Sequence, residues 1–324
     1  MALARSATRK WLFRAAGSGL TLALIFWFLP KEAILQGFTR LSWPLFLSVL
    51  VAFLGCHVAA AAKWWMLMDR AVAFPRALRA HLAGLAANLC LPGAAGGDAV
   101  RAGLAHAELR DGPKVAAAAV GDRMIDLAAL ACLMLIGLVL LPAAVAGGDH
   151  GMAVPVALIV LALAAAALFA FPAVARWLWT RWPGLPARSL GLRLADSFSA
   201  LAKRPLRLLF ALVLSAAIQS VLIWLSIRLA EPVGVHVPVA AWFFAWPLAK
   251  IIATLPLSLG GLGVREGSLA ALLVPFGASA PEVIASGLAW QGILYLAGAL
   301  GALVLVLSGG RLRNGGLALK EISE

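Results

Sequence analysis

Long apolar runs separated by short polar segments dominate this chain. A membrane-spanning helix needs about 20 consecutive apolar residues, and several runs approach or exceed that length. They lie near residues 11–29, 43–62, 117–141, 152–171, 208–227 and 283–307. Because the apolar residues are continuous rather than alternating, the pattern predicts helices and not the strands of a membrane barrel. We therefore expect an all-α polytopic membrane protein with six full transmembrane helices.

Two segments between these runs share one pattern. LPGAAGGDAVRAG (91–103) and LPLSLGGLGVREG (255–267) align without a gap at an offset of 164 residues, and seven of their thirteen positions are identical. Proline and arginine are uncommon in so apolar a chain, so the match indicates an internal repeat. The glycines and arginines that it pairs are Gly96, Gly97 and Arg101 with Gly260, Gly261 and Arg265.

The same offset relates the spans that flank the two motifs. It moves 43–62 onto 207–226 and 117–141 onto 281–305, where other predicted spans lie. Three full spans separate the motifs, and this odd number gives the two halves opposite orientations. Inverted repeats recur in transporters, with the binding site near the membrane midplane. We expect a single transmembrane domain (1–324) that comprises repeat half one (1–145), inverted repeat half two (146–310) and a cytoplasmic tail (311–324).

The basic residues indicate which side of the membrane each segment faces. The net charge is +13, and 22 of the 27 lysines and arginines fall on one side if both termini are cytoplasmic. The positive-inside rule accounts for this bias, so the charge does not imply a nucleic-acid partner. The first motif lies between basic segments and the second between segments poor in Lys and Arg. We expect two re-entrant helical hairpins that enter from opposite sides; the alternative is a pair of ordinary spans joined by a tight turn.

The chemistry of the motifs points to an anion. Proline ends a helix, adjacent glycines permit unusual dihedral angles and close backbone approach, and the helix that follows exposes unpaired amides at its positive end. The guanidinium groups of Arg101 and Arg265 suit a phosphate, so we expect the arginines and both glycine pairs to hold a lipid headgroup. Alternatively, Arg101 pairs with Asp98 and Arg265 with Glu266; both interpretations hold together if the headgroup competes with these acids.

Other polar residues in the apolar regions are weaker candidates for lining a cavity. Asp122, Arg123 and Asp126 in GDRMID (121–126) either line its cytoplasmic mouth or place acids near a helix start. Lys250 either extends to the interface or faces the cavity, and Asn88 is a candidate to bond backbone groups freed at a bend.

Two further features have mainly structural interpretations. His57 and His81 are isolated in the sequence and are expected to be ordinary helix histidines. The basic segment 172–207 carries three tryptophans, which favours a helix lying on the inner leaflet over a plain connecting loop.

Composition and short motifs narrow the function classes. Apolar residues make up 63% of the chain and charged residues 13%, against about 25% charged in soluble domains. The chain has no HExxH, GxSxG or P-loop motif, and its three cysteines lie far apart. We expect no enzymatic activity, no cofactor and no metal.

The motif residues resemble a known family, the transmembrane region of lysylphosphatidylglycerol synthases. The resemblance rests on Gly96, Gly97, Asp98 and Arg101, on the stretch 260–266, and on the DR-x-x-D of 122–126. It implies a bacterial inner (cytoplasmic) membrane protein; stand-alone members occur, some linked to hopanoid biosynthesis. In full-length relatives this region is associated with lipid translocation, while a separate soluble domain transfers the aminoacyl group. The given chain ends at Glu324 without that domain, so aminoacyl transfer is not expected.

These observations favour a lipid flippase or transporter that binds an anionic headgroup at a midplane cavity. Its expected partners are membrane lipids, either an anionic phospholipid or a lipid-linked intermediate. The alternative is an accessory membrane protein that presents such a lipid to a separate biosynthetic enzyme.

Overall fold

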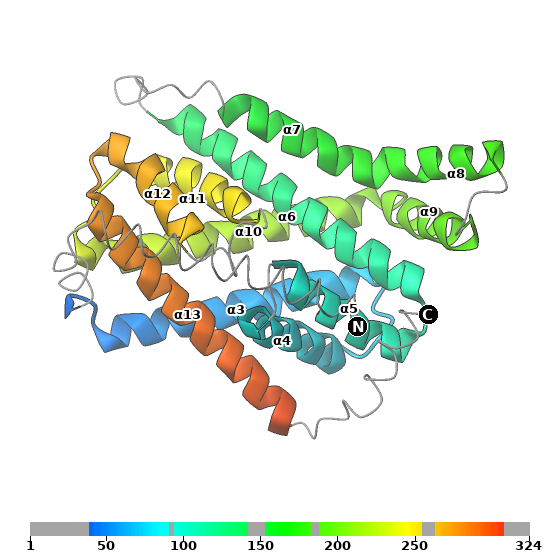
Figure 1. Ribbon diagram of the computed structural model, residues 1–324, viewed down its shortest axis with the longest axis horizontal. Coiled ribbons are helices and arrows are strands. Elements are labelled where there is room, and N and C mark those ends of the chain that lie inside the picture. Colours follow the sequence, from blue (N-terminus) through cyan, green and yellow to red (C-terminus); the bar gives the residue numbers. More distant parts are fainter. Residues whose placement is uncertain (1–38, 91–93, 142–152, 183–187, 255–262, 308–324) are drawn as a thin grey trace, which may run out of the picture.

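The computed structural model describes residues 39–90, 94–141, 153–182, 188–254 and 263–307 (Figure 1). These residues form helices joined by short connections, with no strand among them. The all-α prediction is therefore confirmed for this part of the chain. The predicted span at 11–29 lies outside the described residues.

Among the described residues, four long helices are apolar enough to cross a membrane: α3 (Trp43–Leu67), α6 (Gly112–Leu140), α10 (Pro205–Ala230) and α13 (Ala280–Leu307). Each coincides with a predicted span. Helices of 25 to 29 residues are about 37 to 43 Å long, which exceeds the roughly 30 Å hydrocarbon core. Proline in the first turn starts α3, α6 and α10, where its missing N–H costs no helical bond.

The helix that begins at the predicted span 152–171 continues beyond the apolar run, as far as Arg181. Helix α7 (Ala153–Ala165) passes through a π-helical turn (Ala166–Ala170) into α8 (Phe171–Arg181). Pro172 lacks the N–H that an unbroken α-helix would use, which is a recognised cause of such a turn. Helix α9 (Arg188–Ala202) then packs against α8 and α6. The segment 172–207 is thus neither one surface helix nor a plain loop but a pair of helices, joined where Arg176 donates to Asp196 at 3.0 Å.

Two pairs of shorter helices lie between the long ones. The first pair is α4 (Phe74–Cys90) and α5 (Ala94–Leu109), and the second is α11 (Val239–Ala253) and α12 (Val264–Leu273). Short 3₁₀ turns, Glu231–Val233 and Val274–Phe276, precede α11 and follow α12. Helices of 10 to 17 residues reach about 15 to 26 Å, which is less than the hydrocarbon thickness. These lengths agree with what re-entrant hairpins require; the depth and side of entry stay predictions.

The packing of these elements is reciprocal. Helix α4 packs on α13, and α11 packs on α6, so each short pair contacts the last long helix of the other predicted half. Helices α3 and α10 lie side by side and run in opposite directions. Arg40 before α3 donates to the carbonyl of Val233 after α10 at 3.2 Å, and Arg207 in α10 donates to Met66 near the end of α3 at 3.4 Å.

Two glycines mark close approaches between long and short helices, and they are themselves 164 residues apart. A Cβ atom on Gly137 of α6 would lie 2.4 Å from the backbone nitrogen of Phe244 in α11. A Cβ atom on Gly301 of α13 would lie 2.5 Å from the carbonyl oxygen of Leu82 in α4. Glycine at both positions lets the long helices meet the short ones backbone to backbone.

We expect Gly137→Ala and Gly301→Ala each to lower the free energy of unfolding by about 1–3 kcal/mol, because the added methyl group meets backbone that cannot rotate away. Reversible denaturation of the purified protein in mixed micelles measures this change. Gly55→Ala is the matched control, since its Cβ would meet nothing within 4 Å and alanine favours the helix by up to about 1 kcal/mol. Equal stabilities for all three variants would contradict the packing argument.

Candidate functional site

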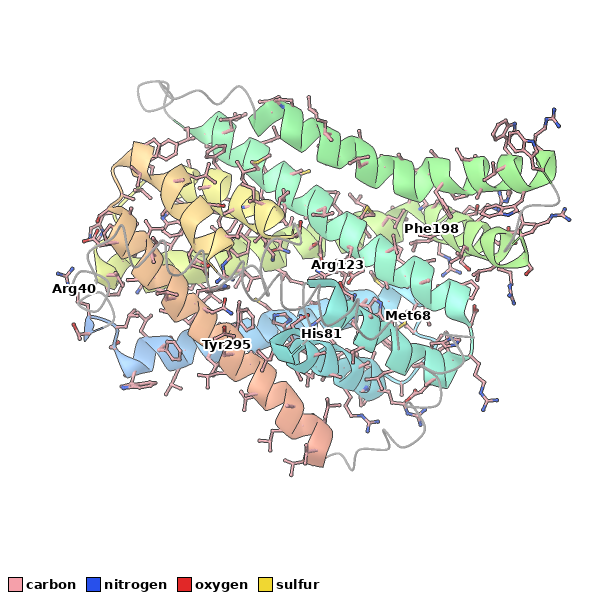
Figure 2. All side chains as sticks on the ribbon, in the orientation of Figure 1. Arg40, Met68, His81, Arg123, Phe198 and Tyr295 are labelled. Carbon is pink, nitrogen blue, oxygen red and sulfur yellow. The ribbon has the colours of Figure 1, made fainter. Side chains whose placement is uncertain are left out.

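Arg101 of helix α5 is buried among side chains of neighbouring helices. Its side chain is only 4% exposed, and Nη2 donates to Oδ2 of Asp122 at 3.1 Å. Nη1 lies 3.4 Å from Nδ1 of His81, and the guanidinium carbon lies 4.5 Å from the centre of the Trp64 ring. His81 in turn bonds His57 at 3.0 Å. The two histidines are therefore not isolated: they extend the surroundings of Arg101. Figure 2 labels His81 and Arg123 in the middle of the bundle.

Lys63 is a site residue that the sequence analysis missed. Its ammonium group lies 3.1 Å from Oδ1 of Asp122 and also pairs with Asp126, while its side chain is 1% exposed. Ser215 from α10 donates to Asp126 and accepts from Lys63 at 3.3 Å. The predicted span ended at 62, which placed Lys63 outside the membrane. The helix in fact continues through Leu67, so this lysine belongs to the interior.

Asp122, Arg123 and Asp126 all take part in this group: the side chain of Asp122 is 4% exposed, that of Asp126 22% and that of Arg123 45%. Helix α6 begins at Gly112, where Asp111 caps it by accepting from the amide of Lys114 at 3.2 Å. The interpretation of Asp122 and Asp126 as acids at a helix start is therefore wrong, because they lie well inside α6. Their charges are balanced by side chains of other helices instead of by the helix end.

The predicted pairing of Asp98 with Arg101 is present but is secondary. Arg101 Nη2 lies 3.4 Å from Asp98, whereas Arg123 binds Asp98 with two donors, one of them at 2.7 Å. Two-donor guanidinium–carboxylate pairs are the stronger kind. Asp98 thus joins α5 to α6 mainly through Arg123.

Gly96 and Gly97 lie inside the first turns of α5, and neither has a positive φ. The expectation of unusual glycine dihedrals is therefore wrong for this pair. Gly97 serves close packing, because its Cβ would lie 2.3 Å from the carbonyl oxygen of Gly84. Its amide donates to Oδ1 of Asn88 at 3.0 Å. The prediction that Asn88 bonds a freed backbone group is therefore confirmed. Because Asn88 accepts from the amide of Gly97, that amide is not available to the ligand that we expected it to bind. Gly260 and Gly261 lie outside the described residues.

Arg265 at the start of α12 pairs with Glu266 and donates to Oε1 of Gln291 at 3.1 Å. Glu266 is buried and accepts from the amide of Gly263 at 2.7 Å, which closes the first turn of the helix. Gly263 has φ +81°, a conformation that glycine adopts without strain. The acid predicted to pair with Arg265 does so, and it also shapes the backbone before it.

Lys250 in α11 points inward, so extension to the interface is excluded in this structure. Its ammonium group donates to Oε1 of Gln219 at 2.8 Å and lies 4.8 Å from the centre of the Trp246 ring. No carboxylate of the described residues lies within 4 Å of it. Asp126, Arg123 and Arg265 are close enough to act on it electrostatically. Lys250 therefore lies near charged side chains of both the Arg101 group and the Arg265 group.

The charges of this central network do not cancel. Five cationic side chains face four carboxylates: Lys63, Arg101, Arg123, Lys250 and Arg265 against Asp98, Asp122, Asp126 and Glu266. Lys250 is the cation of this set without a carboxylate partner among the described residues. Lys250 is partly buried, and an uncompensated charge in the interior of a membrane protein is costly and is by default a sign of function.

The internal repeat in the sequence does not account for most of the charged residues in this network. At the 164-residue offset only the two arginines coincide, whereas Asp122 corresponds to Ser286, Asp126 to Trp290 and Lys250 to Ala86. The ionisable residues of this network thus differ between the two predicted halves. The two matched arginines therefore have unequal surroundings.

Comparison with known families identifies a match. A model of the lysylphosphatidylglycerol synthase TM region family matches residues 12–301. That range includes both motifs and every residue of the central network. A comparison with curated proteins gave no match.

Proposed function

Because this chain belongs to the lysylphosphatidylglycerol synthase transmembrane-region family, and so is a multi-pass membrane protein of lipid metabolism or transport, we propose that it moves an anionic lipid between leaflets. We assign it to the bacterial inner membrane. The proposal involves no covalent step and no cofactor. Its partners are the membrane lipids themselves.

The observation that carries the proposal is the positive charge of Lys250, which has no carboxylate partner in the part of the chain that the structure describes. The phosphate of a lipid headgroup would supply the missing negative charge. The ammonium group already donates a hydrogen bond to Gln219, so it is oriented to donate to a phosphate oxygen beside Gln219. The planar guanidinium of Arg265 lies in the same network and suits phosphate. A headgroup beside Lys250 would compete with Glu266 for Arg265.

Arg101 has a different part in the proposal. Its guanidinium is already engaged by Asp122, Asp98 and the Trp64 ring. We assign it to holding α5 against α6 and α3 in this conformation. A headgroup reaches it only if Asp122 releases it, which would couple binding to movement of one short helix pair.

The two predicted halves suggest how such movement would proceed. The acyl or isoprenoid tails stay in the bilayer, while the headgroup crosses between the short helix pairs. One half then rocks against the other around the site, as in other inverted-repeat transporters. Backbone polar groups at that depth require cover by protein or water, and the reciprocal packing of α4 on α13 and of α11 on α6 supplies protein.

The proposed function is tested by lipid exchange in vesicles. The purified protein is reconstituted into phosphatidylcholine vesicles that contain a trace of fluorescent phosphatidylglycerol, and loss of fluorescence to an impermeant reductant reports exchange. We expect exchange well above that of protein-free vesicles, and slower exchange of fluorescent phosphatidylcholine. Repeating the assay with phosphatidic acid and an anionic isoprenoid phosphate covers other headgroups. Protein-free rates for all three anionic lipids would contradict transport; tight lipid binding without exchange would favour the accessory role.

A further inference from the structure

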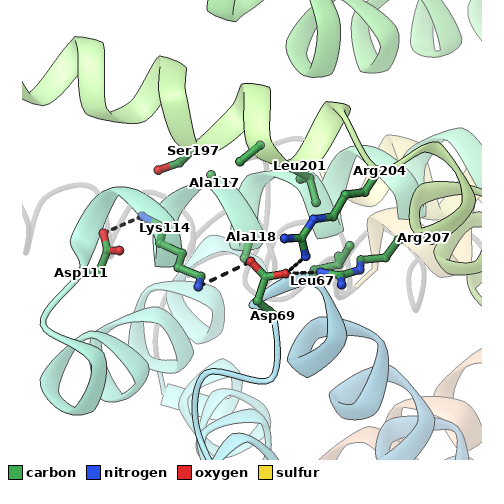
Figure 3. A pocket seen from close by; sticks show the side chains of 11 residues that line it. Leu67, Asp69, Asp111, Lys114, Ala117, Ala118, Ser197, Leu201, Arg204 and Arg207 are labelled. Atoms are coloured by element: carbon green, nitrogen blue, oxygen red, sulfur yellow. Dashed lines mark hydrogen bonds and ion pairs between the residues drawn. The ribbon is translucent and has the colours of Figure 1, made fainter.

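A second charged site lies where α3 ends, α6 begins, and α9 leads into α10 (Figure 3). It is an open pocket of about 160 Å³. None of its lining residues belongs to the central network. Its charged lining residues are Asp69, Asp111, Lys114, Arg204 and Arg207.

Three cations converge on one carboxylate in this pocket. Asp69 lies 3.5 Å from the ammonium group of Lys114 and accepts from both Arg204 and Arg207. Burial opposes ionisation of Asp69, but the hydrogen bond from Arg207 and the charges of Arg204 and Lys114 outweigh it, so its pKa lies below the usual value. Asp69 is therefore ionised at neutral pH and organises the three cations.

The backbone at the pocket is held in an unusual conformation. Asp69 has φ +61°, and Arg110, just before the lining residue Asp111, has φ +52°. Left-handed backbone costs energy for residues other than glycine and persists only where the surrounding structure enforces it. Asp69 and Arg70 form the turn that ends α3, in which the amide of Arg70 donates to the carbonyl of Trp65 at 3.0 Å, and the ion pairs of Asp69 fix the positions of the cations.

The pocket retains capacity to bind an anion. Lys114, Arg204 and Arg207 carry one more charge than Asp69 and Asp111 together, and Asp111 is engaged in capping α6. The side chains of the three cations are 32%, 46% and 29% exposed. A guanidinium offers five N–H donors and an ammonium three, so their bonds to Asp69 leave donors directed to solvent.

We propose that this pocket binds a phosphate group, as a second anion site that is separate from the transport site. Two guanidinium groups and an ammonium group match phosphate oxygens in charge and geometry. The ligand joins the end of α3 and the start of α6 to the start of α10. Its source is either a phospholipid of the nearby leaflet or a free phosphate ion, since both present the same oxygens.

The location is compatible with a lipid source. The basic residues predict that this end of the protein faces the cytoplasmic leaflet. Helix α8, which packs against α9, exposes Trp177, and Trp182 follows it; the two are 59% and 47% exposed. Tryptophan favours the headgroup level of a bilayer. The pocket would thus lie at the depth where phospholipid phosphates occur.

The test measures ligand binding to the full chain in neutral detergent. All variants carry Lys250→Gln, so that lipid at the transport site does not contribute. One arm titrates inorganic phosphate by calorimetry, and the other titrates short-chain phosphatidylglycerol, with short-chain phosphatidylcholine as the comparison. We expect Arg204→Gln combined with Arg207→Gln to weaken binding at least tenfold. Arg188→Gln combined with Arg193→Gln removes two charges from α9 outside the pocket and is expected to leave binding unchanged.

Asp69→Asn gives a result of opposite sign. It removes the internal competitor for the three cations, so binding is expected to tighten while the ligand-free protein becomes less stable. Binding in both arms assigns the site to free phosphate as well as lipid, and binding of phosphatidylglycerol alone assigns it to the lipid. The proposal is overturned if neither ligand binds, or if binding is equal in the pocket double variant and the α9 control. Ligand-free unfolding of each variant shows whether a loss of binding reflects a loss of folding.

Discussion

Lys250→Gln is expected to slow the exchange of anionic lipid by at least about tenfold while the protein remains folded. A hydrogen bond to a charged group contributes about 1.5–3 kcal/mol, which corresponds to roughly 10- to 150-fold in rate or affinity. Folding should survive, because glutamine still reaches toward Gln219 and no carboxylate of the described residues loses its partner. Exchange in vesicles and unfolding in micelles measure the two effects separately.

The controls for this prediction separate charge from shape. Lys250→Arg keeps the charge and can lie over Trp246, so it should retain more exchange than Lys250→Gln. Arg265→Gln should also slow exchange, but it leaves Glu266 with one partner fewer and so lowers stability as well. Arg228→Gln changes a half-exposed ion pair with Glu231 and should exchange lipid at the wild-type rate. Normal exchange in both Lys250→Gln and Arg265→Gln would remove these residues from the headgroup site.

Lys63→Met is expected to lower the free energy of unfolding by about 3–5 kcal/mol. Removing one partner of a buried ion pair leaves an uncompensated charge, which costs about that much. Here two carboxylates lose the same cation, Asp122 and Asp126. Arg101 still neutralises Asp122, while the hydroxyl of Ser215 is the hydrogen-bond partner that Asp126 keeps among the described residues. Denaturation in mixed micelles should show the loss directly.

A second substitution identifies the cause of that loss. Adding Asp126→Asn to Lys63→Met removes the stranded charge, so the double variant should be more stable than Lys63→Met alone. Arg228→Gln is again the comparison, since an exposed pair contributes at most about 1 kcal/mol. If Lys63→Met proved no more harmful than Arg228→Gln, the buried network would not be a determinant of stability.

The unequal surroundings of Arg101 and Arg265 show the limit of the motif. The sequence alignment made the two arginines equivalent, and both were expected to contact the headgroup. In the structure, Arg101 has two acids and an aromatic ring around it, while Arg265 has one acid and a glutamine. The difference arises from residues of other helices, which the alignment of two short segments does not contain. The proposal accordingly assigns contact to Arg265 and positioning to Arg101.

Several features followed from the sequence by itself. Apolar runs long enough for a bilayer identified the helices around 43–62, 117–141, 208–227 and 283–307, because bilayer thickness sets helix length directly. The motif match identified the family and also the neighbouring pair of Arg265 and Glu266. Asn88 was correctly expected to bond a backbone group, because it precedes a predicted bend. All of these depend on properties local to a stretch of chain.

Only the tertiary structure decided which side chains meet. Lys63 was assigned to the membrane surface, yet it lies beside Asp126 and Ser215, which are 63 and 152 residues further along the chain. The absence of a described carboxylate near Lys250, and the pocket around Asp69, likewise depend on how separate helices pack. The pattern of apolar residues determines that a helix forms but not its exact end, since α3 runs to Leu67 and not to residue 62. It does not determine which of its polar residues face a neighbour, because that depends on contacts between residues far apart in sequence.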